Sequence, residues 1–288
     1  MIDAQSLAAR AAHVAGDDLT AGVRLWCQMA RGSAIDLGAT HLIAAWDHDG
    51  PTFRHALFPT YKHRRSGETR ARVAPIRAAL ESLGVVSVSV PGFEGDDVAA
   101  SVMACYRQDA TVTMLSNDSD LLQFVDEQVS VVSYMGVGKG TDGLRVRRWL
   151  AADVQARFGV PPALLADFKA MCGEDGDDIP GIARIGKDTA AKLLRRWQSL
   201  EKALEASEFV SHRDMTAKLA GQHEHARLMR QLTTIRTDAP LPDLTFARCA
   251  LEAVAWASGS TPRASGGSAG PVTRIEAGPG LDEVPWPE

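Results

Sequence analysis

Long apolar runs and paired cysteines are both missing from this sequence. No stretch of 18 consecutive apolar residues occurs, so no segment is expected to span a membrane. The first residues have neither the basic region nor the apolar core of a secretory signal. The four cysteines are scattered, without a CxxC pair or histidines at zinc-ligand spacing. These absences argue against a zinc site and predict a cytoplasmic protein with reduced thiols.

Carboxylates, by contrast, occur in five short clusters, most of them where an apolar run ends and a loop or helix begins. Negative charges gathered at strand ends repel one another unless a cation neutralises them. Hard divalent cations such as Mg²⁺ or Mn²⁺ prefer oxygen ligands of this kind. The pattern therefore predicts metal-assisted phosphate chemistry. The nine candidate metal ligands are Asp3, Asp47, Glu94, Asp96, Asp97, Asp118, Asp120, Glu174 and Asp177.

The net charge of −5 argues at first against a nucleic-acid partner. Without the nine candidate ligands, which a metal would neutralise, the balance becomes −5 + 9 = +4. Residues 54–77 contain seven Lys or Arg and one Glu. An acidic centre with a basic rim suits a phosphate polymer held over metal ions. A solvated basic helix face explains the basic segment equally well when that segment is taken alone.

Short β-rich apolar runs alternate with longer helical patterns, which predicts an α/β fold with a mainly parallel sheet. In open parallel sheets, sites form beyond the carboxyl ends of the strands. Asp47, Asp118 and Asp120 follow expected strands directly or after a short turn, so these acids should converge at one edge. The expected strands are 41–46, 85–90, 111–115 and 129–134, and the helices between them are 70–83 and 97–107.

From residue 150 the pattern becomes helical, and we expect helices over 151–158, 162–171, 189–197 and 215–235. The last 31 residues contain six Gly, five Pro and four Ser, which predicts a disordered tail. Residues 281–286 of this tail are a weak candidate for docking a protein partner. The expected domains are 1–150, 151–257 and the tail 258–288, in a monomeric protein. Only two residues precede Asp3, so either the first strand is very short or the chain start is clipped.

Five segments of the sequence, in order, resemble the 5′ nucleases. This family includes phage 5′-3′ exonucleases, flap endonucleases and the N-terminal domain of bacterial DNA polymerase I. The resemblance covers about residues 2–241 and implies a PIN-like nuclease core with a helical arch (60–83) and a helix-hairpin-helix motif (171–197). It also implies two-metal hydrolysis of DNA phosphodiester bonds at 5′ ends, flaps and duplex junctions, in replication and repair. The matching segments are 2–13, 46–65, 91–100, 116–124 and 171–194.

The same resemblance implies individual roles. All nine acids become ligands of two Mg²⁺ or Mn²⁺ ions, and Lys62, Arg65 and Arg10 become contacts of the cleaved phosphate. Tyr61 would stack on a terminal base, although a packing tyrosine is the alternative. The hairpin amides would hold duplex phosphates, with a possible K⁺ on the turn carbonyls. Further DNA contacts are expected from Arg64, Arg70, Arg72, Gly181, Gly186, Lys187 and Lys192.

Two departures from the family pattern are visible. Gly95 stands where the family has Ala, and Glu174, longer by one methylene, stands where it has Asp. The second change is expected to displace the second metal or to leave it held through water. Helix capping and an Asx turn offer structural explanations for some of the acids. Two other functions remain open: a PIN-like ribonuclease, and a DNA-binding module that has lost catalysis.

Overall fold

The computed structural model describes residues 1–63, 68–137, 144–211 and 213–254. A six-stranded sheet in the order β3-β2-β1-β4-β5-β6 forms the N-terminal half, and only β6 is antiparallel to its neighbour. The predicted mainly parallel α/β fold is confirmed. The first three strands have only two residues each, and β6 was not predicted. The strands are β1 (Ile2–Asp3), β2 (Ala44–Ala45), β3 (Ser87–Val88), β4 (Val112–Leu115), β5 (Val129–Val137) and β6 (Leu144–Trp149).

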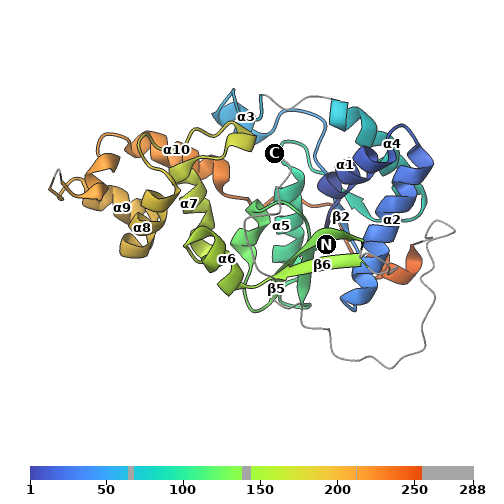
Figure 1. Ribbon diagram of the computed structural model, residues 1–288. Helices are drawn as coiled ribbons and strands as arrows, with labels where there is room; N and C mark the ends of the chain where they lie inside the picture. Colours follow the sequence, from blue (N-terminus) through green and yellow to red (C-terminus); the bar gives the residue numbers. More distant parts are fainter. Residues whose placement is uncertain (64–67, 138–143, 212, 255–288) are drawn as a thin grey trace.

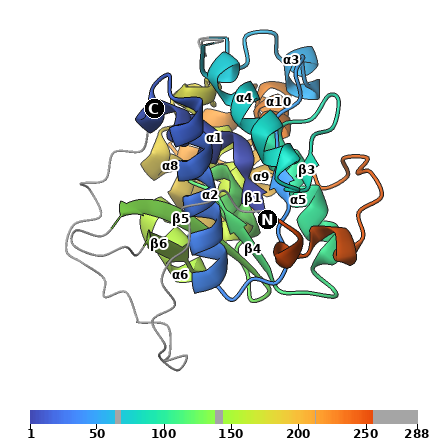
Figure 2. The ribbon, with the colours of Figure 1, turned by 90° about the vertical axis from the view of Figure 1, so that its right-hand side faces the viewer.

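Helices cover both faces of this sheet because its strands are apolar on both sides. Along the segment that holds β2, Leu42 and Ala44 pack with α1 (Ala4–Ala15), α2 (Leu19–Asp36) and α4 (Glu68–Ser82). The alternate residues, Ile43 and Ala45, pack with α5 (Gly95–Tyr106) instead. Figure 2 shows α1, α2 and α4 together on one side of the strands. The sheet is therefore enclosed, and only its edges are open for a site.

A second, helical half extends from one end of the sheet (Figure 1). It shares a core with the first half, in which Met103 and Met114 join Phe168 and Met171. The single helix expected over 215–235 is interrupted: a 3₁₀ turn, Met215–Leu219, precedes α10. The helices of this half are α6 (Ala151–Phe158), α7 (Leu165–Cys172), α8 (Lys187–Trp197), α9 (Leu200–Ser207) and α10 (His223–Thr233).

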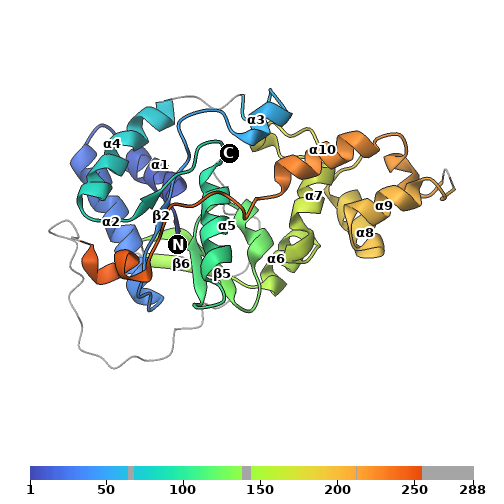
Figure 3. The same ribbon diagram turned by 180° about the vertical axis from the view of Figure 1, so that it is seen from behind.

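After α10 the chain returns across the molecule to the α/β half (Figure 3). The Tyr106 hydroxyl donates to the Leu244 carbonyl at 2.5 Å, and the Leu42 amide donates to the Cys249 carbonyl at 2.8 Å. The two halves are thus joined by this returning segment of the chain as well as by their shared core. Within the described residues, no helix has the length and apolar character to cross a membrane. The expected tail, 258–288, lies outside the described residues.

Candidate metal and nucleic-acid site

Three strands deliver acids to the carboxyl edge of the sheet. Asp3 ends β1 and caps α1, since its side chain accepts from the Ser6 amide at 3.0 Å. Its second oxygen accepts from the Ser116 hydroxyl at 2.6 Å. Asp47 follows β2 and accepts from the Gly95 amide at 2.8 Å, which connects this loop to the start of α5. Asp118 lies just beyond β4, and its side chain caps the turn by accepting from the Asp120 amide at 2.8 Å.

These carboxylates lie within one field of negative charge. Burial, with a contribution from Asp47, raises the pKa of Asp3 to about 6. Burial and the neighbouring Asp120 raise the pKa of Asp118 to about 7. Burial, then the charges of Asp118 and Asp3, raise the pKa of Asp96 well above its usual range. Each group makes its neighbour harder to ionise, so a hard cation would relieve their repulsion. Oxygen donors of this kind fit Mg²⁺ or Mn²⁺.

Glu94 lies at the N-terminus of α5 between two cations. Its carboxylate accepts from Lys62 Nζ at 2.9 Å, from the Tyr61 hydroxyl at 2.8 Å and from Arg54 Nη1 at 3.2 Å. Burial alone would raise the pKa of Glu94, but the charges of Lys62 and Arg54 outweigh it and hold the pKa at about 2. Glu94 is therefore ionised at neutral pH.

Lys62 reaches this position through an unusual backbone. Its φ of 51° lies in the left-handed region that non-glycine residues rarely adopt. The Lys62 amide donates to the Asp177 carbonyl at 3.0 Å, which helps to hold this conformation. Its ammonium also lies 3.7 Å from the Asp177 carboxylate. Lys62 thus connects the segment before α4 with the turn after α7, and its side chain points among the acids.

Tyr61, for which the sequence left base stacking and packing open, lies in a packed position. The residue is only 2% exposed and belongs to the core shared by the two halves. His55 packs against its ring edge-to-face at 5.4 Å, and Lys62 Nζ lies 5.0 Å from the ring centroid. No ring face is open to a base. The hydroxyl donates to Glu94, so Tyr61 positions that carboxylate instead.

Asp97 also differs from its prediction as a metal ligand. It is fully buried and accepts two hydrogen bonds from Arg54, at 2.6 and 2.9 Å. The Glu94 and Arg236 amides donate to the same carboxylate at 3.1 and 2.8 Å. A carboxylate has about four lone-pair sites, and all four are in use. We therefore assign Asp97 a positioning role.

Sequence reasoning missed Arg54, which is 2% exposed in α3 (Phe53–Leu57). Besides its bonds to Asp97 and Glu94, its guanidinium donates to the carbonyls of Leu232 and Thr234 at 2.8 and 3.2 Å. These two carbonyls lie at the end of α10. Arg54 thus fixes the acidic start of α5 against the helical half. Its place in a basic stretch resembled a solvated surface, and no sequence signal separated it from its neighbours.

Lys169 was missed as well. This lysine in α7 is 4% exposed and forms ion pairs with Asp120 and, at 2.8 Å, with Glu174. Its ammonium also donates to the Ser119 hydroxyl at 2.8 Å. A lysine inside an apolar helical run was the available signal. Across the described ranges, no three acidic, imidazole or thiol side chains converge closely enough to hold an ion. Ammonium groups, and not only carboxylates, occupy this edge of the sheet.

Of the remaining predicted arginines, the structure describes the side chains of Arg10 and Arg72. Arg10 is exposed, and its guanidinium lies 4.9 Å from the Tyr134 ring centroid. Arg72 is exposed on α4 and lies 3.7 Å from Asp17. The side chains of Arg64, Arg65 and Arg70 lie outside the described residues. Their predicted roles stay predictions.

The turn that carries Glu174 and Asp177 is joined to the predicted hairpin by two glycines. Gly173 and Gly181 have φ of 84° and 70°, and an added Cβ on Gly181 would lie 2.5 Å from the Gly173 nitrogen. The backbones therefore touch, and only glycine fits at either position. Beyond this contact, Gly186 precedes α8, and the side chains of Lys187 and Lys192 are exposed.

Two family models together cover the described chain. Residues 1–159 match the 5′-3′ exonuclease N-terminal resolvase-like domain, and residues 160–255 match the 5′-3′ exonuclease C-terminal SAM fold. The chain belongs to the 5′-3′ exonuclease family. The predicted resemblance is confirmed. The predicted domain boundary at residue 150 stays a prediction.

Relatives of this exonuclease family occur alone and within polymerases. The chain is 32% identical over 261 residues to the thermostable DNA polymerase I of Thermus filiformis, covering 85% of this chain but 29% of the polymerase. It is 29% identical over 205 residues to the 5′-3′ exonuclease of Bacillus subtilis (strain 168), covering 70% and 67% of the two chains. The T5 D15 flap endonuclease, solved with DNA and metal ions, shares the fold with a TM-score of 0.67, at 19% identity over 82% of this chain and 88% of its own.

Gly95 and Glu174, at which the sequence resemblance implied departures from the family pattern, each lie at a contact in the structure. A Cβ at Gly95 would lie 3.2 Å from Asp47 Oδ1 and 3.3 Å from the Asp47 nitrogen. In this chain, Gly95 lets the start of α5 approach the loop after β2. Glu174 is the residue that reaches Lys169. Each departure therefore lies at a contact between two acid-bearing segments.

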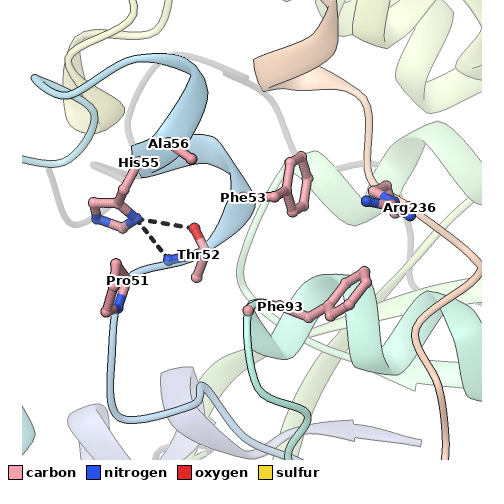
Figure 4. A pocket seen from close by; sticks show the side chains of 8 residues that line it. Pro51, Thr52, Phe53, His55, Ala56, Phe93 and Arg236 are labelled. Atoms are coloured by element: carbon pink, nitrogen blue, oxygen red, sulfur yellow. Dashed lines mark hydrogen bonds between the residues drawn. The ribbon is translucent and has the colours of Figure 1, made fainter.

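A pocket of about 490 Å³ lies beside the acidic edge of the sheet (Figure 4). The Phe53 and Phe93 rings line it and pack against each other with their centroids 5.9 Å apart, and Arg236 lies 5.1 and 4.9 Å from these centroids. None of the nine acids lines the pocket. It is therefore a neighbour of the acidic edge and not the metal site itself.

Proposed function

We propose that this chain is a structure-specific 5′-3′ exonuclease and flap endonuclease that hydrolyses DNA phosphodiester bonds with divalent ions. The observation that supports it best is the set of mutually repelling carboxylates at the strand ends, with Lys62 among them. Charged groups so arranged are costly to a fold unless a cation and an anionic substrate complete them. Family membership points to the same chemistry.

In this proposal the acids divide into two groups of ligands. Asp3, Asp47, Asp96 and Asp118 surround the strand ends, whereas Asp120, Glu174 and Asp177 belong to the turns beside α7. Bound divalent ions would neutralise the phosphate and activate the attacking water. Carboxylate oxygens suit Mg²⁺ or Mn²⁺, and a bound ion would draw together side chains that, within the described residues, do not converge on one point. A K⁺ at the hairpin stays a prediction. Glu94 would orient Lys62 and remain ionised throughout.

Lys62 would contact the phosphate that is cut. Its side chain is 16% exposed, and its ammonium is held between Glu94 and Asp177, so it faces the acidic edge and not bulk solvent. A fixed positive charge stabilises the extra negative charge of a phosphoryl transition state without having to reorganise. Arg10 lies farther out and would contact the same strand. Arg65 completes this proposed set.

DNA is the proposed partner. The exposed Lys187 begins α8 and the exposed Lys192 lies in its middle, and a helix start with backbone amides and nearby lysines suits duplex phosphates. The T5 flap endonuclease was solved with DNA and metal ions, and the Thermus relative is a DNA polymerase. Roles in replication and repair, a monomeric state, a cytoplasmic location and a protein partner for the tail are further parts of this proposal.

The decisive experiment is product analysis on a 5′-labelled flap duplex with Mg²⁺, with and without EDTA. We expect cleavage near the flap junction, and its loss in EDTA. Asp118→Asn should reduce cleavage by at least about 100-fold while retaining DNA binding. Asp109→Asn, at an exposed aspartate beyond the far end of α5, is the matched control and should cleave normally. Normal cleavage by the Asp118 variant would refute the site.

Two other functions are separated by the same substrates. A PIN-like ribonuclease would cut single-stranded RNA faster than the flap duplex. A DNA-binding module without catalysis would bind the flap duplex and leave it intact at every Mg²⁺ or Mn²⁺ concentration. Either result would replace the proposed function.

A further inference from the structure

Lys169 has an unusual environment for a lysine. The residue is 4% exposed, and its ammonium contacts Asp120, Glu174 and the Ser119 hydroxyl. Burial would lower the pKa of this ammonium, but Asp120 and then Glu174 raise it above its usual value. The group is therefore a fixed positive charge inside the acidic edge. A lysine buried to this degree is rare unless it is paired.

The partners of this ammonium come from different segments. Asp120 begins the 3₁₀ turn after β4, and Glu174 follows α7. The two carboxylates contact the same ammonium, and without a cation between them they would repel each other. The ammonium therefore holds the two segments together. These same two carboxylates belong to the group that the proposed function gives to a second divalent ion.

We infer that the Lys169 ammonium occupies the place of a second divalent ion between Asp120 and Glu174, and that this ion binds only by displacing it. The inference rests on the proposed function and adds a feature of its regulation. The oxygens that would coordinate the ion are the oxygens that accept from Lys169, so the two cations exclude each other. The first ion, among the acids at the strand ends (Asp3, Asp47, Asp96 and Asp118), does not face this competition.

Glu174 sets the strength of this competition. Its carboxylate lies 2.8 Å from Lys169 Nζ. An aspartate at position 174 is shorter by one methylene, so the same contact would lengthen beyond hydrogen-bonding distance unless the backbone moved. The longer side chain of this chain therefore favours the ammonium over the ion. The structure thus assigns a binding consequence to that departure from the family pattern.

Direct Mn²⁺ binding without DNA tests the inference independently of catalysis. Free Mn²⁺ is counted by electron paramagnetic resonance, and affinities are measured by calorimetry, on the full chain. We expect one tighter and one weaker class of ion. Lys169→Met should tighten the weaker class by about tenfold or more, the effect of losing one charge-assisted hydrogen bond. The matched control, Lys202→Met, removes an exposed lysine of α9 to which no binding role is assigned, and it should change neither class.

Glu174→Asp provides a second variant, in case the methionine variant does not fold. It retains both charges and should tighten the weaker class by about threefold or more. Thermal melting in EDTA should show a lower midpoint for Lys169→Met, and saturating Mn²⁺ should narrow its difference from wild type. Two ions bound with unchanged or weaker second-class affinity in both variants would overturn this inference alone. A wild-type chain that binds no Mn²⁺ would overturn the proposed function with it.

Discussion

Replacing Arg54 by methionine tests whether the buried ion pair holds the site together. Methionine keeps an apolar stem of similar reach but removes all of the guanidinium donors. Asp97, which is fully buried, would then lose two of its four hydrogen bonds and its counter-charge. Breaking a buried pair by removing one partner typically costs about 3–5 kcal/mol. The carbonyls of Leu232 and Thr234 would also lose their donor.

Urea unfolding followed by circular dichroism measures this loss. With a denaturant slope of about 3 kcal/mol/M, a loss of 3 kcal/mol moves the midpoint by about 1 M. Lys62→Met is the comparison, because Lys62 contacts the same Glu94 carboxylate but is partly exposed. Its midpoint should move by much less, whereas its cleavage rate should fall by at least about 100-fold. The two cations around Glu94 thus separate stability from chemistry.

An unchanged midpoint for Arg54→Met would refute the reasoning, because it would mean that Asp97 needs no buried counter-charge. A Lys62→Met variant that cleaves at the wild-type rate would refute the proposed phosphate contact. Substrate binding without metal gives a further check. The folded fraction of Arg54→Met should bind DNA with wild-type affinity, so any loss of binding should match the fraction of protein that is unfolded.

Three further outcomes follow from the same contacts. In EDTA the melting temperature should fall as pH rises from about 4 to 7. Folding raises the pKa of Asp3 and Asp118, so the stability that their protonated forms contribute is lost as they ionise. Asp118→Asn or saturating Mg²⁺ should flatten this fall in melting temperature. Gly95→Ala should destabilise the protein by about 1 kcal/mol, seen as a lower melting temperature, since its Cβ would crowd the loop after β2. Gly181→Ala should reduce both melting temperature and duplex affinity, measured by fluorescence anisotropy, whereas Gly186→Ala, with no atom within 4 Å of its Cβ, should change the melting temperature little.

The sequence predicted where the acids would gather because the ends of parallel strands can be located from apolar runs, without knowledge of side-chain contacts. Apolar runs that end in Asp47 and Asp118 indicated parallel strands, and parallel strands bring their carboxyl ends to one edge. The strands were placed well, but β2 and β3 shrank to two residues each. Hydrogen bonding between strands decides such boundaries, and a single sequence does not contain it.

The roles of individual charges were harder to predict. Asp97 and Asp96 are neighbours in one acidic motif, yet one is paired with a buried arginine and the other is raised in pKa by neighbouring acids. Arg54 resembled a solvated cation because its partners Glu94 and Asp97 are distant in sequence. Lys169 lies in an apolar helical run, but its partner Asp120 is 49 residues away. The sequence left Tyr61 ambiguous between stacking and packing, and its burial favours packing. Partner choice depends on tertiary contacts that local patterns do not specify.

The backbone contact between Gly173 and Gly181 has a mechanical consequence. Glu174 directly follows one glycine, and the predicted hairpin begins at the other, so direct backbone contact joins the proposed duplex-binding hairpin to the proposed metal ligands. A duplex held by α8 would stand at a constant offset from the acids, whatever its sequence. The number of nucleotides between the junction and the cut would then be fixed by this contact, and adding one methyl group there would change that number.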